Sequence, residues 1–226
     1  MSFLRQALAI AAKDLRSEVR SKETVNASLS FALVILLLFS FAFDPEADTT
    51  KALSGGLLWI VFAFAGTLVL NRSFARELPN DCLDALIAAP ISGAALFLGK
   101  ALANYVLVLA VEAISLPVFG IFYNVHWTNQ LPELLLVLGL GTWALTIIGT
   151  IFSALTVNIR LREIMLPMLT YPILVPALMA AMRLTMDLVA GNAIGPETLP
   201  WLKMLIGFDV AYTAVSLFLV ETVLVG

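Results

Sequence analysis

Residues 131–157 read LPELLLVLGLGTWALTIIGTIFSALTV, and Glu133 is the one charged residue among them. The hydrocarbon core of a bilayer is about 30 Å thick, and a helix needs about 20 apolar residues to cross it. Backbone N–H and C=O groups find no water in hydrocarbon, so a segment of this kind pairs them internally as a helix. The stretch therefore predicts a membrane-spanning helix.

Five other stretches have the same apolar character. The six predicted spans are roughly Val25 to Phe43, Leu53 to Leu70, Leu96 to Tyr123, Leu131 to Val157, Ile164 to Met186 and Met204 to Val225. Of the 226 residues, 61% are hydrophobic and 13% are charged, whereas soluble domains have about 45–50% and about 25%. The surplus must face lipid. We predict an all-α integral membrane protein in which residues 1–226 form a single transmembrane domain.

The basic residues gather on one side of these spans. Short cytoplasmic loops carry the Lys/Arg excess in membrane proteins, and a cytoplasmic N-terminus puts ten of the thirteen basic residues on that side. The ten are Arg5, Lys13, Arg16, Arg20, Lys22, Arg72, Arg76, Lys100, Arg160 and Arg162. With six spans, both termini are then predicted to be cytoplasmic.

Other counts exclude several classes of site. The net charge is -3 and the basic residues form no stripe, which disfavours nucleic-acid binding. A single cysteine, Cys82, excludes an internal disulfide, and a single histidine, His126, excludes a His-cluster metal site built by this chain alone.

Residues 1–23 precede the first span and are too polar to cross a bilayer. Apolar residues recur there every three or four positions, at Leu4, Leu8, Ala11, Leu15 and Val19, with charged residues between them. This spacing predicts an amphipathic helix that lies along the cytoplasmic interface. The alternative is a basic topology signal with no other role.

On the other side of the predicted spans, Trp59 and Trp127 fall near span boundaries, as in the aromatic belts of membrane proteins. The last outer loop, residues 187–203, contains glycine and proline but also several apolar residues, and we expect a short helix on the outer surface. His126, beside Trp127, is interpreted as a polar boundary residue and not as an axial ligand of haem iron.

The longest charged loop, residues 71–95, is predicted to face the cytoplasm. Asn80 or Asp81 is a candidate N-cap for a short helix within it, and Pro90 would end that helix. Leu83 and Leu86 would share one face of the helix. Such a helix, rimmed by charge, has the properties needed to dock a soluble partner and transmit its movement. The alternative is a solvated connector.

This loop also carries a specific likeness. Its pattern consists of Arg72, Phe74, Glu77, Leu78, Asp81, Leu83, Asp84, Leu86 and Pro90. It resembles the loop of the CcmB family, the permease of the cytochrome c maturation (haem exporter) ABC system. Gly55-Gly56-Leu57-Leu58-Trp59, Gly141-Thr142 and Leu166-Pro167-x-Leu169-x-x-Pro172 extend the resemblance over nearly the whole chain.

The resemblance implies an ABC-2-type permease architecture in the bacterial inner membrane. It implies that the nine loop residues contact a separate, CcmA-like ATPase subunit, which binds the ATP. Further implied partners are CcmC-like and CcmD-like membrane subunits and a CcmE-like haem chaperone. Two copies of the chain, or one copy with another membrane subunit, would pair with an ATPase dimer. The driven event is either haem translocation or release of haem-loaded chaperone, and both remain open.

The sequence agrees that ATP is handled elsewhere. Its nearest approach to a phosphate-binding loop is residues 93–101, GAALFLGKA, which has one residue too many between the glycines and Ala101 where Ser or Thr must hold magnesium. We interpret Lys100 as a lysine near a helix start that snorkels toward water. The chain is therefore not predicted to be an enzyme.

Two features lie inside the predicted spans. Pro167, Pro172 and Pro176 each remove a backbone hydrogen bond from the fifth span, which predicts a broken helix that gates or lines a pathway, the alternative being a static kink. Glu112 lies in the middle of the third span, where an ionised acid costs about 2.5–3.5 kcal/mol. It is either a functional acid or a neutral one bonded to Ser115 or a neighbouring subunit.

Three other functions fit the same residues. The first is an ABC-2-type permease for another cargo, such as a drug or a lipid. The second is a non-transporting assembly subunit that relays ATPase movement to its partners. The third is an ion-coupled secondary transporter that uses Glu112 and needs no ATPase.

Overall fold

The computed structural model describes residues 3–43, 48–78, 82, 86, 91–125 and 127–225. Its elements are α1 (Phe3–Ser21), α2 (Glu23–Ala42), α3 (Asp48–Ser73), the 3-10 helix η1 (Ala75–Glu77), α5 (Gly93–Phe122), α6 (Leu131–Thr156), α7 (Arg162–Val189) and α8 (Leu199–Val225). Six of these helices are long and apolar enough to cross a membrane, and they coincide with the six predicted spans. The prediction of an all-α membrane fold is confirmed.

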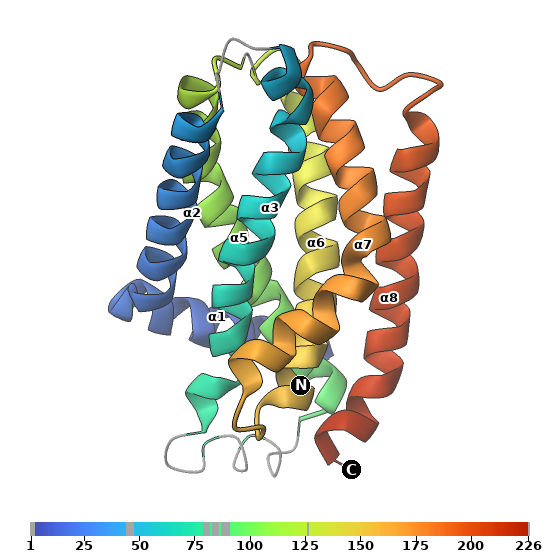
Figure 1. Ribbon diagram of the computed structural model, residues 1–226. Coiled ribbons are helices and arrows are strands. Elements are labelled where there is room, and N and C mark those ends of the chain that lie inside the picture. The colour runs from blue at the N-terminus through green and yellow to red at the C-terminus, as the bar shows by residue number, and fades with distance from the viewer. Residues whose placement is uncertain are drawn as a thin grey trace.

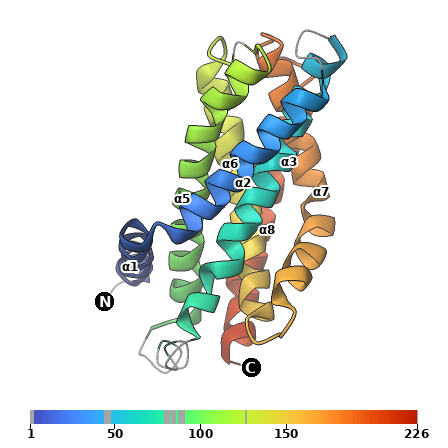
Figure 2. The ribbon, with the colours of Figure 1, turned by 60° about the vertical axis from the view of Figure 1, so that its left-hand side comes forward.

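The six long helices run up and down one bundle, and α1 runs crosswise to them near one end, against the side of α5 (Figure 1, Figure 2). α6 occupies the centre, where it packs against α3, α5, α7 and α8. Both chain ends lie toward the same end of the bundle (Figure 1), as an even number of spans requires.

Trp59 is a core residue, so the prediction that it belongs to an interfacial belt is wrong. Its side chain is fully buried, and its indole Nε1 donates a hydrogen bond to Thr185 Oγ1 at 2.9 Å. The ring occupies the space beside Gly141 on α6, where an added Cβ would come within 2.1 Å of it. The missing side chain at Gly141 therefore lets α3 pack closely on α6.

This close approach predicts opposite effects for two glycine-to-alanine changes. Gly141→Ala is expected to lower the free energy of unfolding by about 1–3 kcal/mol, because it overpacks the space that Trp59 fills. Gly56→Ala serves as the control, since nothing lies within 4 Å of a Cβ there, and it should stabilise α3 by about 0.5–1 kcal/mol. Thermal unfolding of both variants in the same detergent measures the difference. Equal shifts would contradict the packing described.

α1 is an amphipathic helix, as predicted, and it has two apolar sides. Ala7, Ile10 and Ala11 are buried. They face α5, which comes close because Gly99 has no side chain: a Cβ there would lie 2.7 Å from the Ala7 carbonyl oxygen. A second set of apolar residues remains exposed, and it consists of Phe3, Leu4, Leu8 and Val19. α1 is therefore attached to the bundle by one side and leaves an apolar side uncovered.

α7 contains Pro167, Pro172 and Pro176 inside one continuous helix. Figure 1 shows this helix bending in its middle, so that its first half swings sideways across the bundle. Proline supplies no N–H and its ring crowds the preceding turn, which accounts for the bend. The predicted helix break is thus a bend within an unbroken helix.

The connector between α7 and α8 is shorter than predicted. α7 continues to Val189 and α8 begins at Leu199, so the non-helical part is residues 190–198, all of which the structure describes. These nine residues form turns, with Gly191 at φ +90°, and contain no helix. The expected short surface helix within residues 187–203 is wrong, because its apolar residues extend the two long helices.

A candidate functional site at the basic end of the bundle

Most of the basic residues meet at the end of the bundle that carries α1. We call this the basic end, meaning α1, the α3 terminus with η1, the first turns of α5, and residues 157–163 between α6 and α7. All ten basic residues predicted to share one side lie on these elements or at Lys22, where α1 meets α2. The two views show these elements together at one end (Figure 1, Figure 2).

Lys100 is at the centre of this charge network, and the interpretation that it snorkels is wrong. Its side chain is only 1% exposed. Its ammonium group donates to Glu77 Oε1 at 2.7 Å and to the Ser73 carbonyl oxygen at 3.0 Å, and lies 3.0 Å from Asp14 Oδ2. Lys13 contacts Glu77 Oε1 as well, at 2.5 Å. These bonds join α1, η1 and α5 through one buried cation.

Glu18 forms a second junction, between α1, α2 and η1. Its Oε1 accepts hydrogen bonds from the backbone amides of Thr24 and Val25, both at 2.9 Å, and so caps the start of α2. Its Oε2 pairs with Arg76, which also donates to Thr24 Oγ1. Burial alone would raise the pKa of the Glu18 carboxyl, but the Val25 amide and the Arg76 guanidinium outweigh it and hold that pKa below its usual value.

Phe74 anchors the start of the predicted coupling loop. Its ring is fully buried among Ala154, Val157 and Leu78, and the Lys100 ammonium lies 5.5 Å from the ring centroid. A cation at this distance from an aromatic face is attracted to it. The loop therefore leaves the bundle from a fixed point that contacts both α5 and the end of α6.

The nine predicted coupling residues are only partly within the described structure. Arg72, Phe74, Glu77 and Leu78 lie at the basic end, and Arg72 pairs with Glu23 at the start of α2. Leu86 is helical and half-buried. The others, Asp81, Leu83, Asp84 and Pro90, lie outside the described residues, as does His126. The contacts of a coupling helix therefore stay a prediction.

Sequence reasoning considered Lys100 and Glu112 separately and missed that polar residues form one buried stripe along α5. Lys100, Asn104, Glu112 and Ser115 are all buried. Asn104 donates to Ser73 Oγ and to Thr150 Oγ1, both at 2.9 Å, next to the Lys100 network. The sequence contains the signal for this stripe. Residues four apart share one face of a helix, and Lys100, Asn104 and Glu112 are separated by four and eight residues. A polar stripe in an apolar span faces protein, not lipid.

Glu112 is bonded, but not to the residue that was expected. Its Oε1 accepts a hydrogen bond from Thr142 Oγ1 on α6 at 2.6 Å, while Ser115 Oγ has no partner among the described residues. On α8, Asp209 is 7% exposed, and neither carboxyl oxygen has a hydrogen-bond partner in the described part of the chain. A functional role for Glu112 stays a prediction.

Nearly the whole chain resembles one protein family. The family model described as "CcmB protein" matches residues 5–225. Heme exporter protein B of Rhodobacter capsulatus is 31% identical over 210 residues, which is 93% of this chain and 94% of the relative. The Paracoccus denitrificans protein of the same name is 30% identical with the same coverage, and that of Escherichia coli K12 is 26% identical over 168 residues, or 74% and 76% of the two chains.

Proposed function

This chain belongs to the CcmB family, and from that premise we propose that it is the membrane permease of an ABC-type haem exporter. The names of the relatives support haem as the cargo, and the six long helices support a role in the membrane. A separate ATPase subunit would bind and hydrolyse the ATP. In this proposal the basic end and the loop of residues 71–95 face the cytoplasm at the inner membrane. The connector at residues 190–198 faces outside.

The network around Lys100 is the observation that carries the coupling role. Residues 74–78 lead directly into the predicted coupling helix, and Glu77 shares Lys100 with Asp14. Arg76 in the same turn pairs with Glu18. A displacement of the loop by an ATPase would therefore act at once on α1, α2 and α5. Packed elements and ion-pair networks of this kind carry coupling between distant sites.

The cargo-handling partners follow from the family. We propose a complex with CcmC-like and CcmD-like membrane subunits and a CcmE-like chaperone, in which two permease copies, or one copy and another membrane subunit, meet an ATPase dimer. An assay in reconstituted vesicles distinguishes two roles for ATP: driving haem across the membrane, or releasing the haem-loaded chaperone. ATP-dependent haem movement supports translocation, whereas chaperone release without haem movement supports a relay.

Co-purification with the ATPase tests the coupling role. Leu83→Asp is expected to reduce the ATPase retained by more than about tenfold, because a charge replaces an apolar contact in the predicted coupling helix. Ala193→Asp is the control, since it puts the same charge on the exposed connector at the opposite end. Unchanged retention with Leu83→Asp would contradict the coupling assignment. ATPase-independent transport that needs Glu112 would favour the ion-coupled alternative.

A further inference from the structure

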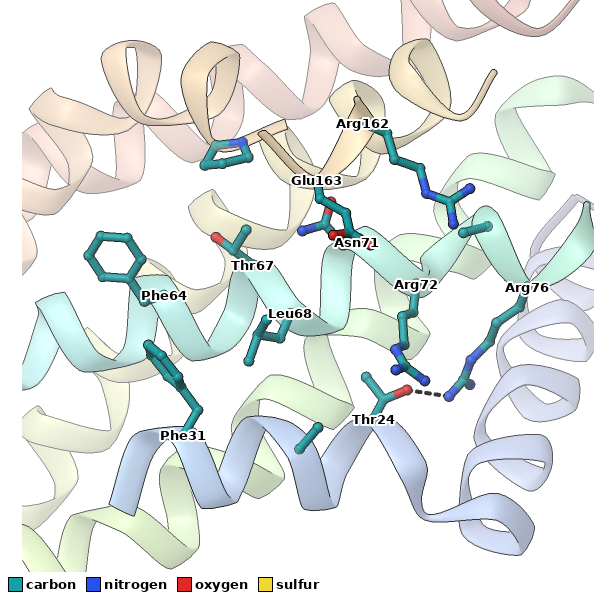
Figure 3. A pocket seen from close by; sticks show the side chains of 13 residues that line it. Thr24, Phe31, Phe64, Thr67, Leu68, Asn71, Arg72, Arg76, Arg162 and Glu163 are labelled. Carbon is teal, nitrogen blue, oxygen red and sulfur yellow. Dashed lines mark hydrogen bonds between the residues drawn. The ribbon is translucent and has the colours of Figure 1, made fainter. Parts of the chain in front are cut away.

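A cavity of about 630 Å³ opens between α2, α3 and α7 at the basic end. This volume falls within the range of about 300–1,000 Å³ that is usual for small-molecule sites. Its walls come from the first turns of α2, the last third of α3 and the first two turns of α7. Figure 3 shows the labelled side chains around it.

The two ends of this cavity differ in chemistry. Phe31 and Phe64 lie together at one end, while Arg72, Arg76 and Arg162 lie at the other (Figure 3). Phe64 and Arg72 are eight residues apart on α3, which is about 12 Å along a helix axis. The cavity thus places an aromatic wall deep among the spans and cationic groups near the bundle end.

The charges at the cationic end are not all neutralised. Arg72 pairs with Glu23, and Arg76 pairs with Glu18. Arg162 forms no ion pair with any residue that the structure describes, although Glu163 also lines the cavity. An anion could therefore bind at Arg162 without displacing an existing ion pair.

The bend of α7 explains why the cavity exists. Pro172 and Pro176 remove hydrogen bonds from the middle of the helix, and the half that begins at Arg162 swings away from the axis of the other half (Figure 1). Pro167, on the displaced half, lines the cavity. A straight helix would follow a different path past α3. The same prolines that were predicted to gate a pathway thus shape one wall of a binding space.

We propose that this cavity binds an amphiphilic anion, with its acidic group at Arg162 and its apolar body against Phe31 and Phe64. Two sources have this chemistry: haem, a flat apolar ring with two carboxylates, and an anionic phospholipid of the same leaflet. Guanidinium groups suit carboxylate and phosphate equally. The haem source rests on the proposed function, whereas the lipid source does not.

The test uses the full chain in nanodiscs of zwitterionic lipid. Haem binding is titrated by tryptophan quenching, and phosphatidylglycerol is added in a separate series and quantified by native mass spectrometry. Arg162→Gln and Phe64→Ala are each expected to weaken binding of one probe by about tenfold or more. The matched control for Arg162→Gln is Arg160→Gln, because Arg160 does not line the cavity. The matched control for Phe64→Ala is Phe41→Ala, because Phe41 on α2 is 81% exposed and lies outside the cavity. All four variants are compared for thermal unfolding.

The outcomes separate the sources and the proposals. Weaker haem binding in both cavity variants assigns the cavity to the cargo, and weaker phosphatidylglycerol binding assigns it to lipid. If the cavity variants match their controls with both probes, the proposal is overturned. The same samples are tested for ATPase retention, which the cavity variants should keep. Retained ATPase with unaltered probe binding would overturn the cavity proposal alone. Failure of the Leu83→Asp test would contradict the coupling assignment and would leave the probe binding of the cavity variants unchanged.

Discussion

Lys100→Met is expected to lower the free energy of unfolding by about 3 kcal/mol, the lower end of the range for removing one partner of a buried ion pair. The side chain is 1% exposed, and its loss leaves Asp14 and Glu77 without their buried cation. Lys13 still contacts both carboxylates, at 3.2 and 2.5 Å, which moderates the loss. Thermal unfolding followed by tryptophan fluorescence measures the change.

Lys13→Met is the matched control for this prediction. Lys13 shares both carboxylates with Lys100, but its side chain is 47% exposed. Exposed ion pairs contribute about 0–1 kcal/mol, because water competes for the charges and holding the long side chain costs entropy. The Lys13 change should therefore have a small effect. Similar destabilisation by the two substitutions would show that burial of Lys100 does not decide the strength of the network.

Glu18→Gln is expected to destabilise the junction of α1 and α2 by about 2–3 kcal/mol at neutral pH. The change removes the charge that faces Arg76 and weakens the cap on the Thr24 and Val25 amides. Arg76 is 28% exposed and keeps Thr24 as a partner, so the effect is smaller than for a fully buried cation. Thermal unfolding at pH 7 measures the loss.

The same residue gives the protein a predictable response to acid. Hydrogen bonds and Arg76 hold the pKa of Glu18 below the 4.5 of an unperturbed carboxyl. The carboxylate therefore stabilises the fold above pH 4.5, and this contribution is lost as the pH falls through the folded pKa. Wild type should lose stability over that acid range more steeply than Glu18→Gln. Glu197→Gln, on the exposed connector, should keep the wild-type slope, and a flattened slope there would argue against Glu18 as the cause.

Features that depend only on the residues of one segment were predicted correctly. The six spans follow from runs of apolar residues, because the free energy of transferring a segment into lipid depends on the residues of that segment and not on its neighbours. The amphipathic helix over residues 3–21 and the bend at the α7 prolines are local for the same reason. The predictions that failed for Trp59 and Lys100 concerned side chains whose surroundings depend on which helix lies opposite.

The sequence alone determined the class, the spans, the shared side of the basic residues and, through the loop pattern, the family. Each of these is encoded in residue type and spacing along one segment. Tertiary structure decided that Lys100 is shared by Asp14 and Glu77, that Gly141 faces Trp59, and that Arg162 and Phe64 line one cavity. Those pairs lie far apart in the chain, and the way the helices pack against one another, which no single segment encodes, brings them together.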